Sequence, residues 1–398
     1  MKTLWDHRSI IRGVPPVPVD ETAAVRRAVE AAAGPGSAVA SYEPLTGGTY
    51  NVVTRVTFED GRDWVVKIPP LHGAGMSYEQ RLLVNEVTFY EKAALVGRGT
   101  IPQVVHSRAD ATEPAGAYVV MTACPGRPWH DLDAELTDSE RRRLRTELGQ
   151  LVGRLHTVTG PGGFGYPAEP FGPPSPTWRE AFTAMTGAVL DDAEAYGAQL
   201  PWSTGKIRAL LGSADYVLDD VTRPALVHFD LWQGNLLVTG EPGTRSIGGI
   251  IDGERMFWGD PVADFVSAAL FGDLEADRDF LSGYASTAGG PVEFTPSVRL
   301  RLALYRSYLY LIMLTETVPR GAPADALEWT RTEVAPRLVA ALGEVAALNE
   351  VAALGEVAAL NEVAALGEMA APNGVAAPDR PAPGHVVGIS RRSAGSGG

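Results

Sequence analysis

The sequence is poor in cysteine and lysine. Its 398 residues include one cysteine, Cys124, so an intramolecular disulfide is excluded and a cysteine-based zinc cluster lacks its ligands. Lysine occurs only at positions 2, 67, 92 and 206, and all other lysine-or-arginine positions carry arginine. Lys67 falls within a predicted strand, and a lysine kept there in an arginine-rich chain suggests a specific role.

Long apolar segments and surplus positive charge are also missing. The most apolar stretch, 302–315, is interrupted by Arg306 and is too short to span a bilayer. The opening residues, MKTLWDHRSIIRG, lack the apolar core of a signal peptide. The net charge of −14 argues against nucleic acid as a partner and is compatible with a cationic small substrate. We expect a soluble cytoplasmic monomer or homodimer that binds neither nucleic acid nor membranes.

The length predicts about two to three structural units. The order of patterns predicts an α+β fold with a small β-rich lobe followed by a larger helical lobe. Residues 1–36 are expected to form an N-terminal helical extension. The β-rich lobe with a connecting hinge is predicted over 37–123, the helical lobe over 124–341, and a low-complexity tail over 342–398.

The small lobe is predicted to contain a β-meander, a helix and two further strands. The turn triplets TGG and EDG separate segments rich in β-branched and aromatic residues. A helix over 78–95 follows, because its apolar residues recur at helical spacing. The predicted strands span 37–45, 49–58, 63–68, 101–107 and 117–123.

The larger lobe begins with a clear helix signal. Thr137 and Glu140 form a capping box at the start of a predicted helix over 137–156. His156, at the end of this helix, is expected to be a satisfied core or capping group. Farther on, the stretch LVHFDLWQGNLLV, 226–238, places polar residues between two apolar runs. This pattern predicts a loop held between two strands, and such a loop commonly presents side chains to a ligand.

The tail is a hexapeptide repeat. Variants of GEVAAL and NEVAAL recur every six residues from Gly343 to Pro378. Six residues rotate a helix by about 600°, so successive leucines point in different directions and no coiled-coil seam forms. We predict a loosely helical or disordered tail outside the fold, without a role in function.

Groups suited to phosphate chemistry occur in a recognisable order. A glycine-containing turn at Gly47 and Gly48 is followed by Lys67 on a strand and Glu86 on a helix. Next come His228, Asp230 and Asn235 in the pattern H-x-D-x-x-x-x-N, and then Asp252 at the end of a strand. This is the order of the corresponding groups in kinases.

Each group has a physical reason to be there. Backbone N–H groups near Gly47, Gly48 and Thr49 can approach phosphates because glycine has no Cβ. Lys67 supplies a cation for the phosphates, and Glu86, on the apolar face of its helix, points inward and needs a partner. The remaining groups supply oxygens: Asn235 and Asp252 are hard ligands that suit Mg²⁺, and Asp230 can accept a hydroxyl proton as general base.

The chain resembles the superfamily of aminoglycoside phosphotransferases and fructosamine kinases, which are small-molecule relatives of protein kinases. LVHFDLWQGNLLV, followed by IIDGERMFWGDPVADF, matches its signature. LTGGTYNVVTRV is similar to its nucleotide loop, and GRLHTVTGPGGFG to its helix before the substrate loop. The resemblance covers about residues 38–340. It implies the two-lobed kinase-like fold, with ATP or GTP and Mg²⁺ bound between the lobes.

The resemblance also assigns roles to residues of this chain. Asp230 is implied as the base, Asn235 and Asp252 as magnesium ligands, and Lys67 with Glu86 as an ion pair. His228 and Asp264 are implied to support the catalytic loop. The nucleotide site is expected to contain Gly47, Gly48, Thr49, Asn51, Lys67, Glu86, Met121, Thr122 and Cys124. The acceptor site is expected to contain Glu254, Tyr305 and Tyr308.

The sequence departs from the family pattern at three positions. Phe229 replaces a common glycine, Gly253 replaces a larger residue, and Thr122 replaces an acidic hinge residue. None of these changes removes a group with a chemical role. They leave the subfamily undecided.

Less specific interpretations exist for each feature. The glycine pair can be a plain hairpin turn, Lys67 an edge-strand charge, and Asp252 a turn former. Tyr305, Tyr308 and Trp329 can be core aromatics. The acidic residues Asp191, Asp192 and Glu194 can form a solvated helix face.

Three functions remain as hypotheses. The first is transfer of the γ-phosphate of ATP or GTP to a hydroxyl of an antibiotic, which would confer resistance by inactivation. The second is the same chemistry on a metabolite sugar, such as a ketosamine or an amino sugar. The third is a non-catalytic pseudokinase that binds a partner.

Overall fold

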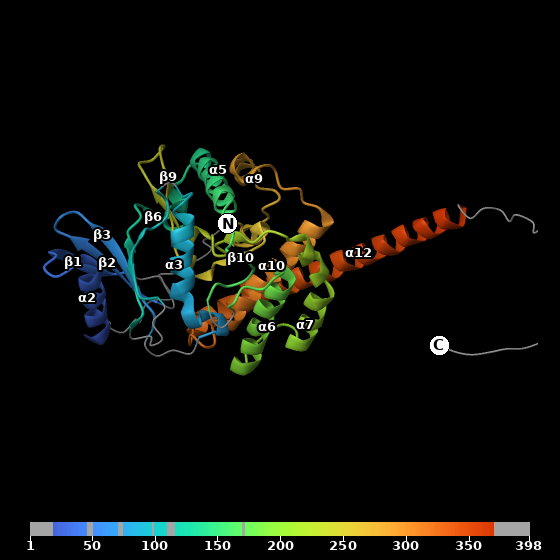
Figure 1. Ribbon diagram of the computed structural model, residues 1–398, viewed down its shortest axis with the longest axis horizontal. Coiled ribbons are helices and arrows are strands. Elements are labelled where there is room, and N and C mark those ends of the chain that lie inside the picture. Colours follow the sequence, from blue (N-terminus) through green and yellow to red (C-terminus); the bar gives the residue numbers. More distant parts are fainter. Residues whose placement is uncertain are drawn as a thin grey trace, which may run out of the picture. The chain divides into compact units, whose positions relative to one another are not determined.

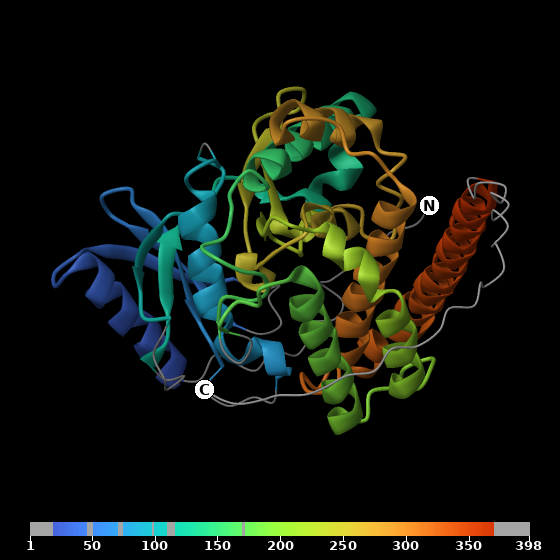
Figure 2. The same ribbon diagram turned by 45° about the vertical axis from the view of Figure 1, so that its right-hand side comes forward.

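A computed structural model describes most of the chain. The described residues are 19–45, 51–70, 75–97, 99–109, 116–168 and 172–369, with the side chains of 19–21 and 355–369 left aside. The chain divides into one compact unit, Met1–Val351, and a second unit, Ala352–Gly398. Within the first unit, the strands of residues 39–68 and the helix Val19–Ala33 (α2) lie on one side, and most of the helices lie on the other (Figures 1 and 2).

The β-rich lobe is built on a five-stranded antiparallel sheet with the strand order β1-β2-β3-β5-β4. Its elements are α2 Val19–Ala33, β1 Val39–Pro44, β2 Val52–Phe58, β3 Asp63–Ile68, η1 Ser77–Arg81, α3 Leu82–Ala93, β4 Val104–Ser107 and β5 Val119–Thr122. β3 is the middle strand, so Lys67 does not lie on a sheet edge. The predicted strands and helix of this lobe are therefore confirmed: β3 has the predicted bounds, and the other elements are shorter over the described residues.

Alternation along the strands decides which face carries Lys67. Val66 on β3 packs in a small core with Val25 and Val29 of α2. Because successive side chains of a strand point to opposite faces, Lys67 lies on the face opposite α2. That face also carries the buried Met121 of β5, which belongs to the main core together with α3.

The helical lobe contains two small antiparallel sheets among its helices. β6 Arg127–Pro128, β8 Leu236–Thr239 and β9 Ser246–Ile250 form one, and β7 Ala225–Val227 pairs with β10 Phe257–Gly259 in the other. The helices are α4 Trp129–Leu132, η3 Asp133–Glu135, α5 Asp138–Leu155, α6 Trp178–Tyr196, α7 Thr204–Ser213, η4 Asp215–Asp220, η5 Gln233–Asn235, η6 Gly253–Arg255, η7 Pro261–Ala263, α8 Asp264–Ala268, α9 Arg278–Ala288, α10 Pro296–Thr315, α11 Ala324–Trp329, the π-helix Thr330–Val334 and α12 Ala335–Met369.

The predicted loop is confirmed as a connection between strands. Residues 228–235 run from β7 to β8, but these strands pair with other partners and not with each other. Asp252 follows strand β9. The short strands thus bring Asp230, Asn235 and Asp252 to neighbouring strand ends.

Helix α5 begins and packs as its sequence predicts. Thr137 N–H donates to Glu140 Oε2 at 3.0 Å, and Thr137 Oγ1 accepts the Glu140 N–H at 3.3 Å, which is the predicted capping box. Glycines let α5 approach α9 closely, because a Cβ on Gly149 would lie 2.1 Å from the Phe280 carbonyl oxygen. This contact positions the C-terminal end of α5, where His156 lies.

The repeat region begins inside the fold. α12 is a continuous helix, and its residues Leu342 and Val345 are fully buried in the main core. The compact unit extends to Val351, so the expected boundary at residue 341 was drawn too early. The lack of a constant apolar face does not prevent burial at the start of the repeat. A single helical turn can enter the core with one inward-facing leucine and one valine, here Leu342 and Val345. No described helix is long and apolar enough to cross a membrane.

Candidate active site

One carboxylate holds the 228–235 loop in a tight turn. Asp264 Oδ2 accepts the His228 N–H at 3.1 Å, and Asp264 Oδ1 accepts the Phe229 N–H at 2.6 Å. Asp264 is fully buried. Two donated N–H groups compensate for the loss of water around this carboxylate and orient the loop. The structure thus places Asp264 in contact with the backbone of the loop.

The buried ring of Phe229 offsets the backbone strain at this position. Its φ of 62° is left-handed, a conformation that costs a non-glycine residue about 1–2 kcal/mol. Its ring is completely buried, with centroid distances of 5.0 Å to Phe257 and 5.5 Å to Tyr308. Burial of such a ring stabilises by about 1.5–3 kcal/mol, which offsets the backbone strain. The departure changes packing behind the loop and leaves its polar groups in place.

His228 connects Asp230 to the end of β9. Its Nδ1 accepts the Asp230 N–H at 3.1 Å, and its Nε2 lies 3.0 Å from the Ile251 carbonyl oxygen. An Nδ1 that accepts and an Nε2 that faces a carbonyl define the neutral ring with the proton on Nε2. The ring therefore couples the backbone of Asp230 to the residue before Asp252, which is a supporting position.

His156 is a third partner of Asp264. Its Nε2 lies 2.9 Å from Asp264 Oδ2, and its Nδ1 lies 2.9 Å from the Tyr284 hydroxyl. The expectation of a satisfied core histidine is confirmed, since the side chain is buried. What the sequence could not indicate is the partner, because Asp264 is far along the chain and meets His156 only through the packing of α5.

Asp230 and Asn235 lie at opposite ends of the loop and touch. Asn235 Nδ2 donates to the Asp230 carbonyl oxygen at 2.9 Å, which leaves the amide oxygen of Asn235 for a cation. The Asp230 side chain is 19% exposed, so it is accessible to a substrate. Burial raises the pKa of Asp230, and the positive charge of Arg255 opposes that shift. A carboxylate of this kind is a suitable proton acceptor.

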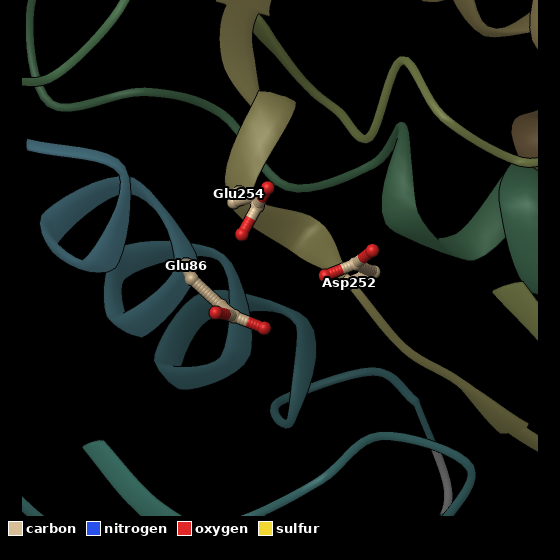
Figure 3. Close-up of side chains that lie close together, drawn as sticks. All are labelled: Glu86, Asp252 and Glu254. Carbon is tan, nitrogen blue, oxygen red and sulfur yellow. The ribbon is translucent and has the colours of Figure 1, made fainter. Parts of the chain in front are cut away.

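Lys67 joins three carboxylates from both lobes. Its Nζ donates to Glu86 Oε1 at 2.6 Å and to Asp252 Oδ1, and it lies 3.9 Å from Glu254 Oε2. Figure 3 shows the side chain of Glu86 on helix α3 near those of Asp252 and Glu254, which come from a segment of the helical lobe. The predicted Lys67–Glu86 pair is present. Carboxylate oxygens of the three acids lie within 4.8 Å of one another, which suits a cation.

Tyr90 extends this cluster and was not singled out from sequence. Its hydroxyl donates to Glu86 Oε1 at 2.7 Å and accepts the Asp252 N–H at 3.0 Å. Asp252 has a left-handed φ of 65°, and the bond to Tyr90 helps to hold that conformation. The available signal was the spacing of Glu86 and Tyr90, which places both on one face of α3.

The charged groups of this cluster shift one another's pKa values. Burial raises the pKa of Glu254 to about 8, with a further contribution from the negative Asp252. Burial also acts to raise the pKa of Asp252, but the charge of Lys67 outweighs it and the pKa is lowered. Burial would lower the pKa of Lys67, yet Asp252 and Glu86 raise it well above its ordinary value. Lys67 and Asp252 are therefore charged at neutral pH.

Gly253 is required by close packing. A Cβ at this position would lie 2.3 Å from Cδ1 of Phe89 on α3. A larger residue would push η6 away from α3. The departure at Gly253 thus brings Asp252 and Glu254 close to Glu86.

Backbone bonds hold the hinge against neighbouring segments. Thr122 N–H donates to the Gln103 carbonyl oxygen, and Ala123 N–H donates to that of Asp63, both at 2.9 Å. Thr122 Oγ1 accepts the Gln103 N–H at 2.9 Å. Met121 is buried behind them.

Two of the three expected acceptor residues belong to the core. Tyr305 and Tyr308 are fully buried; Tyr305 OH donates to Asp260 Oδ2 at 2.8 Å and Tyr308 OH lies 3.1 Å from Tyr166 OH. Their assignment to the acceptor site was wrong, and core packing accounts for them. Glu254 Oε2 lies 3.9 Å from Lys67 Nζ.

The remaining candidates have structural partners or lie outside the described residues. Gly47, Gly48 and Thr49 are outside the described part of the chain. Asn51 is described, and its Nδ2 donates to Glu254 Oε2 at 2.7 Å. The acidic residue Asp192 accepts bonds from the backbone and hydroxyl of Ser77 at 2.7 and 2.6 Å, which is a structural role.

Arg255 is a further charged neighbour that sequence reasoning missed. Its Nε lies 3.8 Å from Asp230 Oδ2, and its guanidinium donates to Glu316 Oε2 at 2.7 Å. The available signal was its place directly after Asp252 and Glu254 in IIDGER, where charged residues follow a strand end.

Known proteins resemble this chain over most of its length. The sequence profile of the phosphotransferase enzyme family matches residues 41–303, so the chain belongs to this family. It is 30% identical over 174 residues to a probable ketoamine kinase of Synechocystis sp.. That alignment covers 40% of this chain and 52% of the relative, so the chain spans about half the length of the curated relative it matches.

Solved structures show the fold. A candidate fructosamine-3-kinase of Thermobifida fusca has a TM-score of 0.56 at 22% identity, covering 79% of this chain and 98% of that one. The aminoglycoside phosphotransferase APH(4)-Ia, in complex with AMP-PNP and hygromycin B, has a TM-score of 0.53 at 20% identity, covering 81% and 98%. The predicted two-lobed kinase-like fold is confirmed.

Proposed function

We propose that this protein transfers the γ-phosphoryl group of ATP or GTP to a hydroxyl of a small molecule, in a Mg²⁺-dependent reaction. The observation that carries the proposal is the convergence of Lys67, Asp230 and Asp252. Lys67 comes from the β-rich lobe and contacts Asp252, while His228 links the backbone of Asp230 to the residue before Asp252. Family membership supports the same chemistry.

In the proposed step, Asp230 accepts the proton of the acceptor hydroxyl. The hydroxyl oxygen forms a bond to the γ-phosphorus as the bond from that phosphorus to the β,γ-bridging oxygen breaks, and the nucleoside diphosphate leaves. Little covalent help from the protein is needed, so rate depends on positioning and on neutralising charge. Asp230 is held for this task by His228 and by the Asp264-anchored loop.

The donor set fits a magnesium ion. Asp252 offers a carboxylate, and Asn235 an amide oxygen that its own hydrogen bond leaves available. These two residues would hold Mg²⁺, whose charge would offset that of the nucleotide phosphates. Lys67, kept in place by Glu86 and Tyr90, would bind the phosphates directly.

For the acceptor we propose a ketoamine, a sugar joined to an amine. The support is the curated relative at 30% identity, which is named as a probable ketoamine kinase. An antibiotic, which sequence reasoning placed first, is the second candidate. Its support is a fold neighbour in complex with hygromycin B and a net charge of −14 that suits cationic drugs.

The deciding experiment measures nucleotide turnover with Mg²⁺ in the presence of fructosyl-amines, amino sugars and aminoglycosides. Asp230→Asn serves as the control, because it keeps the shape of the side chain and removes its charge. We expect acceptor-dependent turnover that falls by about 10²–10⁴-fold in the variant while nucleotide binding persists.

Each result has a distinct meaning. Turnover with ketoamines alone supports the first acceptor, and turnover with aminoglycosides alone supports the second. Nucleotide binding without turnover on any acceptor would favour the pseudokinase hypothesis. Absence of nucleotide binding would contradict the proposed function altogether.

A further inference from the structure

A guanidinium group lies beside the proposed base with donors to spare. Arg255 Nε is 3.8 Å from Asp230 Oδ2, which is an ion-pair distance but too long for a hydrogen bond. The side chain of Arg255 is 12% exposed. Its described hydrogen bond uses one Nη of the guanidinium, toward Glu316. The Nε edge of the group faces Asp230 and has no hydrogen-bond partner among the described residues.

A buried ionic chain holds Arg255 from behind. Glu316 Oε2, near the end of α10, accepts from Arg255 at 2.7 Å and lies 3.2 Å from a guanidinium nitrogen of Arg320. Arg320 in turn contacts Glu79 of η1, whose carboxylate is fully buried. Such a chain fixes the guanidinium in one place, and fixed charges act on a reaction without reorganising.

Arg255 is the positive charge that the described part of the chain places beside Asp230. The residues between Asp230 and Asn235 are Leu, Trp, Gln and Gly, and none is basic. Among the described residues, Arg255 is the ion-pair partner of Asp230, while Lys67 is engaged with Glu86 and Asp252. A transferred phosphoryl group would arrive at Asp230 with negative charge on its oxygens.

We propose that Arg255 binds an oxyanion next to Asp230, as the second cation of the phosphoryl-transfer site. Arg255 Nε can donate to one oxygen of the anion, while Asp230 Oδ2, 3.8 Å from that Nε, accepts the proton of the acceptor hydroxyl and does not bond to the anion itself. Two sources share this chemistry: the phosphoryl group as it passes to the acceptor, and a carboxylate carried by the acceptor. The inference rests on the proposed function for the role of Asp230, but not for the anion site itself.

The first test needs no acceptor. Binding of inorganic phosphate is measured by calorimetry with Mg²⁺ and ADP at saturation, in wild type, Arg255→Gln and Arg255→Lys. We expect Arg255→Gln to weaken phosphate binding at least about tenfold and Arg255→Lys to restore part of it. The control is Arg299→Gln, because Arg299 pairs with Glu275 at the exposed surface; its phosphate binding should equal that of wild type.

A folding control accompanies these variants. Arg255→Gln leaves Glu316 with Arg320 as its remaining partner, which can lower stability. The double variant Arg255→Gln/Glu316→Gln removes both charges of the pair, and its phosphate binding should be as weak as that of the single variant. Phosphate binding that is equally tight in wild type and the folded Arg255 variants overturns the proposal, as does a wild type that binds no phosphate.

The second test separates the two sources by kinetics with fructosyl-glycine and its amide. If the anion is the phosphoryl group, Arg255→Gln lowers kcat for both acceptors by about 10²-fold or more. If it is the acceptor carboxylate, the variant raises KM for fructosyl-glycine and leaves the amide unchanged. Unchanged kcat and KM for both would overturn the proposal. Absence of turnover in wild type would count against the proposed function, and phosphate binding alone would then decide on Arg255.

Discussion

Two residues of the site adopt left-handed backbone conformations without being glycine. Phe229 has a φ of 62° and Asp252 a φ of 65°, and each lies shortly after a strand. The strain of each, about 1–2 kcal/mol, is opposed by a hydrogen bond from its own N–H, to Asp264 and to Tyr90. At this scale the site is a pair of sharp turns that aim Asp230 and Asp252 at the same space.

Asp264→Asn tests the first turn. The variant keeps the size of the side chain but replaces one carboxylate oxygen by an NH₂ group, which cannot accept a hydrogen bond. In the wild type, Oδ1 accepts the Phe229 N–H, and Oδ2 accepts the His228 N–H and lies beside His156 Nε2. We expect a loss of about 1.5–3 kcal/mol in the free energy of unfolding and a fall in kcat of at least about tenfold. Urea unfolding and turnover with the responding acceptor measure both. A variant with wild-type stability and kcat would show that Asp264 does not organise the loop.

Cys124 gives a pH-dependent probe of the hinge. Burial raises the pKa of its thiol to about 11. The reactive thiolate is therefore scarce near pH 8 and increases about tenfold for each pH unit until the pH nears that pKa. We expect slow iodoacetamide labelling at pH 8, faster labelling at higher pH, and a large acceleration in urea, followed by mass spectrometry.

Because Cys124 is the single cysteine of the sequence, every labelled thiol in this measurement is that of Cys124. If the Cys124 amide faces the purine, Mg²⁺ with nucleotide should slow labelling further. If the folded protein is labelled at pH 7 as fast as in urea, the conclusion that burial keeps the Cys124 thiol protonated is wrong.

At the scale of elements, glycines set the distance between the lobes. Gly253 lets η6 approach Phe89 on α3, and Gly249 on β9 lets the hinge approach, since an added Cβ there would lie 2.6 Å from the Cβ of Cys124. Contacts of this kind bring the carboxylates of Asp252 and Glu254 toward Lys67. The position of α3 relative to η6 is therefore as important as the identity of the charged residues.

Gly253→Ala tests this closeness. The added methyl group overlaps the fully buried ring of Phe89, and overpacking of this sort costs about 1–3 kcal/mol. We expect a lower melting temperature and weaker nucleotide binding, because α3 carries Glu86. Thermal unfolding and nucleotide titration measure the two effects.

Gly212→Ala on α7 is the matched control, because an added Cβ there meets no atom within 4 Å. It should leave nucleotide binding unchanged and can raise stability by about 0.5–1 kcal/mol, since alanine favours helix. Equal effects of the two substitutions would refute the packing explanation for Gly253.

At the scale of the whole molecule, the fold ends within the repeat. The compact unit reaches Val351, and Leu342 and Val345 are buried although they belong to or adjoin the hexapeptide pattern. The repeat as a whole has no constant apolar face. Its first turn can still be buried, because one turn requires apolar residues only where it contacts the core. A duplicated sequence can thus supply residues to the core at one end only.

Two truncations test where the fold ends. Removal of 352–398 should leave the melting temperature and nucleotide binding unchanged. Removal of 342–398 deletes two buried side chains, each worth about 1.5–3 kcal/mol, and should lower the melting temperature by several degrees. Equal melting temperatures for the two truncations would contradict a core role for the first repeat.

The sequence by itself determined the order of the elements and the chemistry-bearing residues. Periodicity, turn residues and caps act over a few neighbouring positions, so the capping box at Thr137, the strand with Lys67 and the loop with Asp230 could be predicted. The resemblance added the fold, because it compares separated motifs together. The spacing of Tyr90 placed it on one face of its helix with Glu86. Nothing in the sequence indicated that Tyr90 would meet Asp252 or that Arg255 would meet Asp230.

Only the tertiary structure decided the partners. The side chains of His156 and Asp264 meet because α5 packs against α9, and Arg255 reaches Asp230 because Glu316 and Arg320 hold it from another helix. The tertiary structure also decided that Tyr305 and Tyr308 are buried. Helical spacing alone cannot distinguish a core tyrosine from one that lines a pocket. The physical reason is that burial and long-range contacts depend on how elements pack, while local sequence determines the elements themselves.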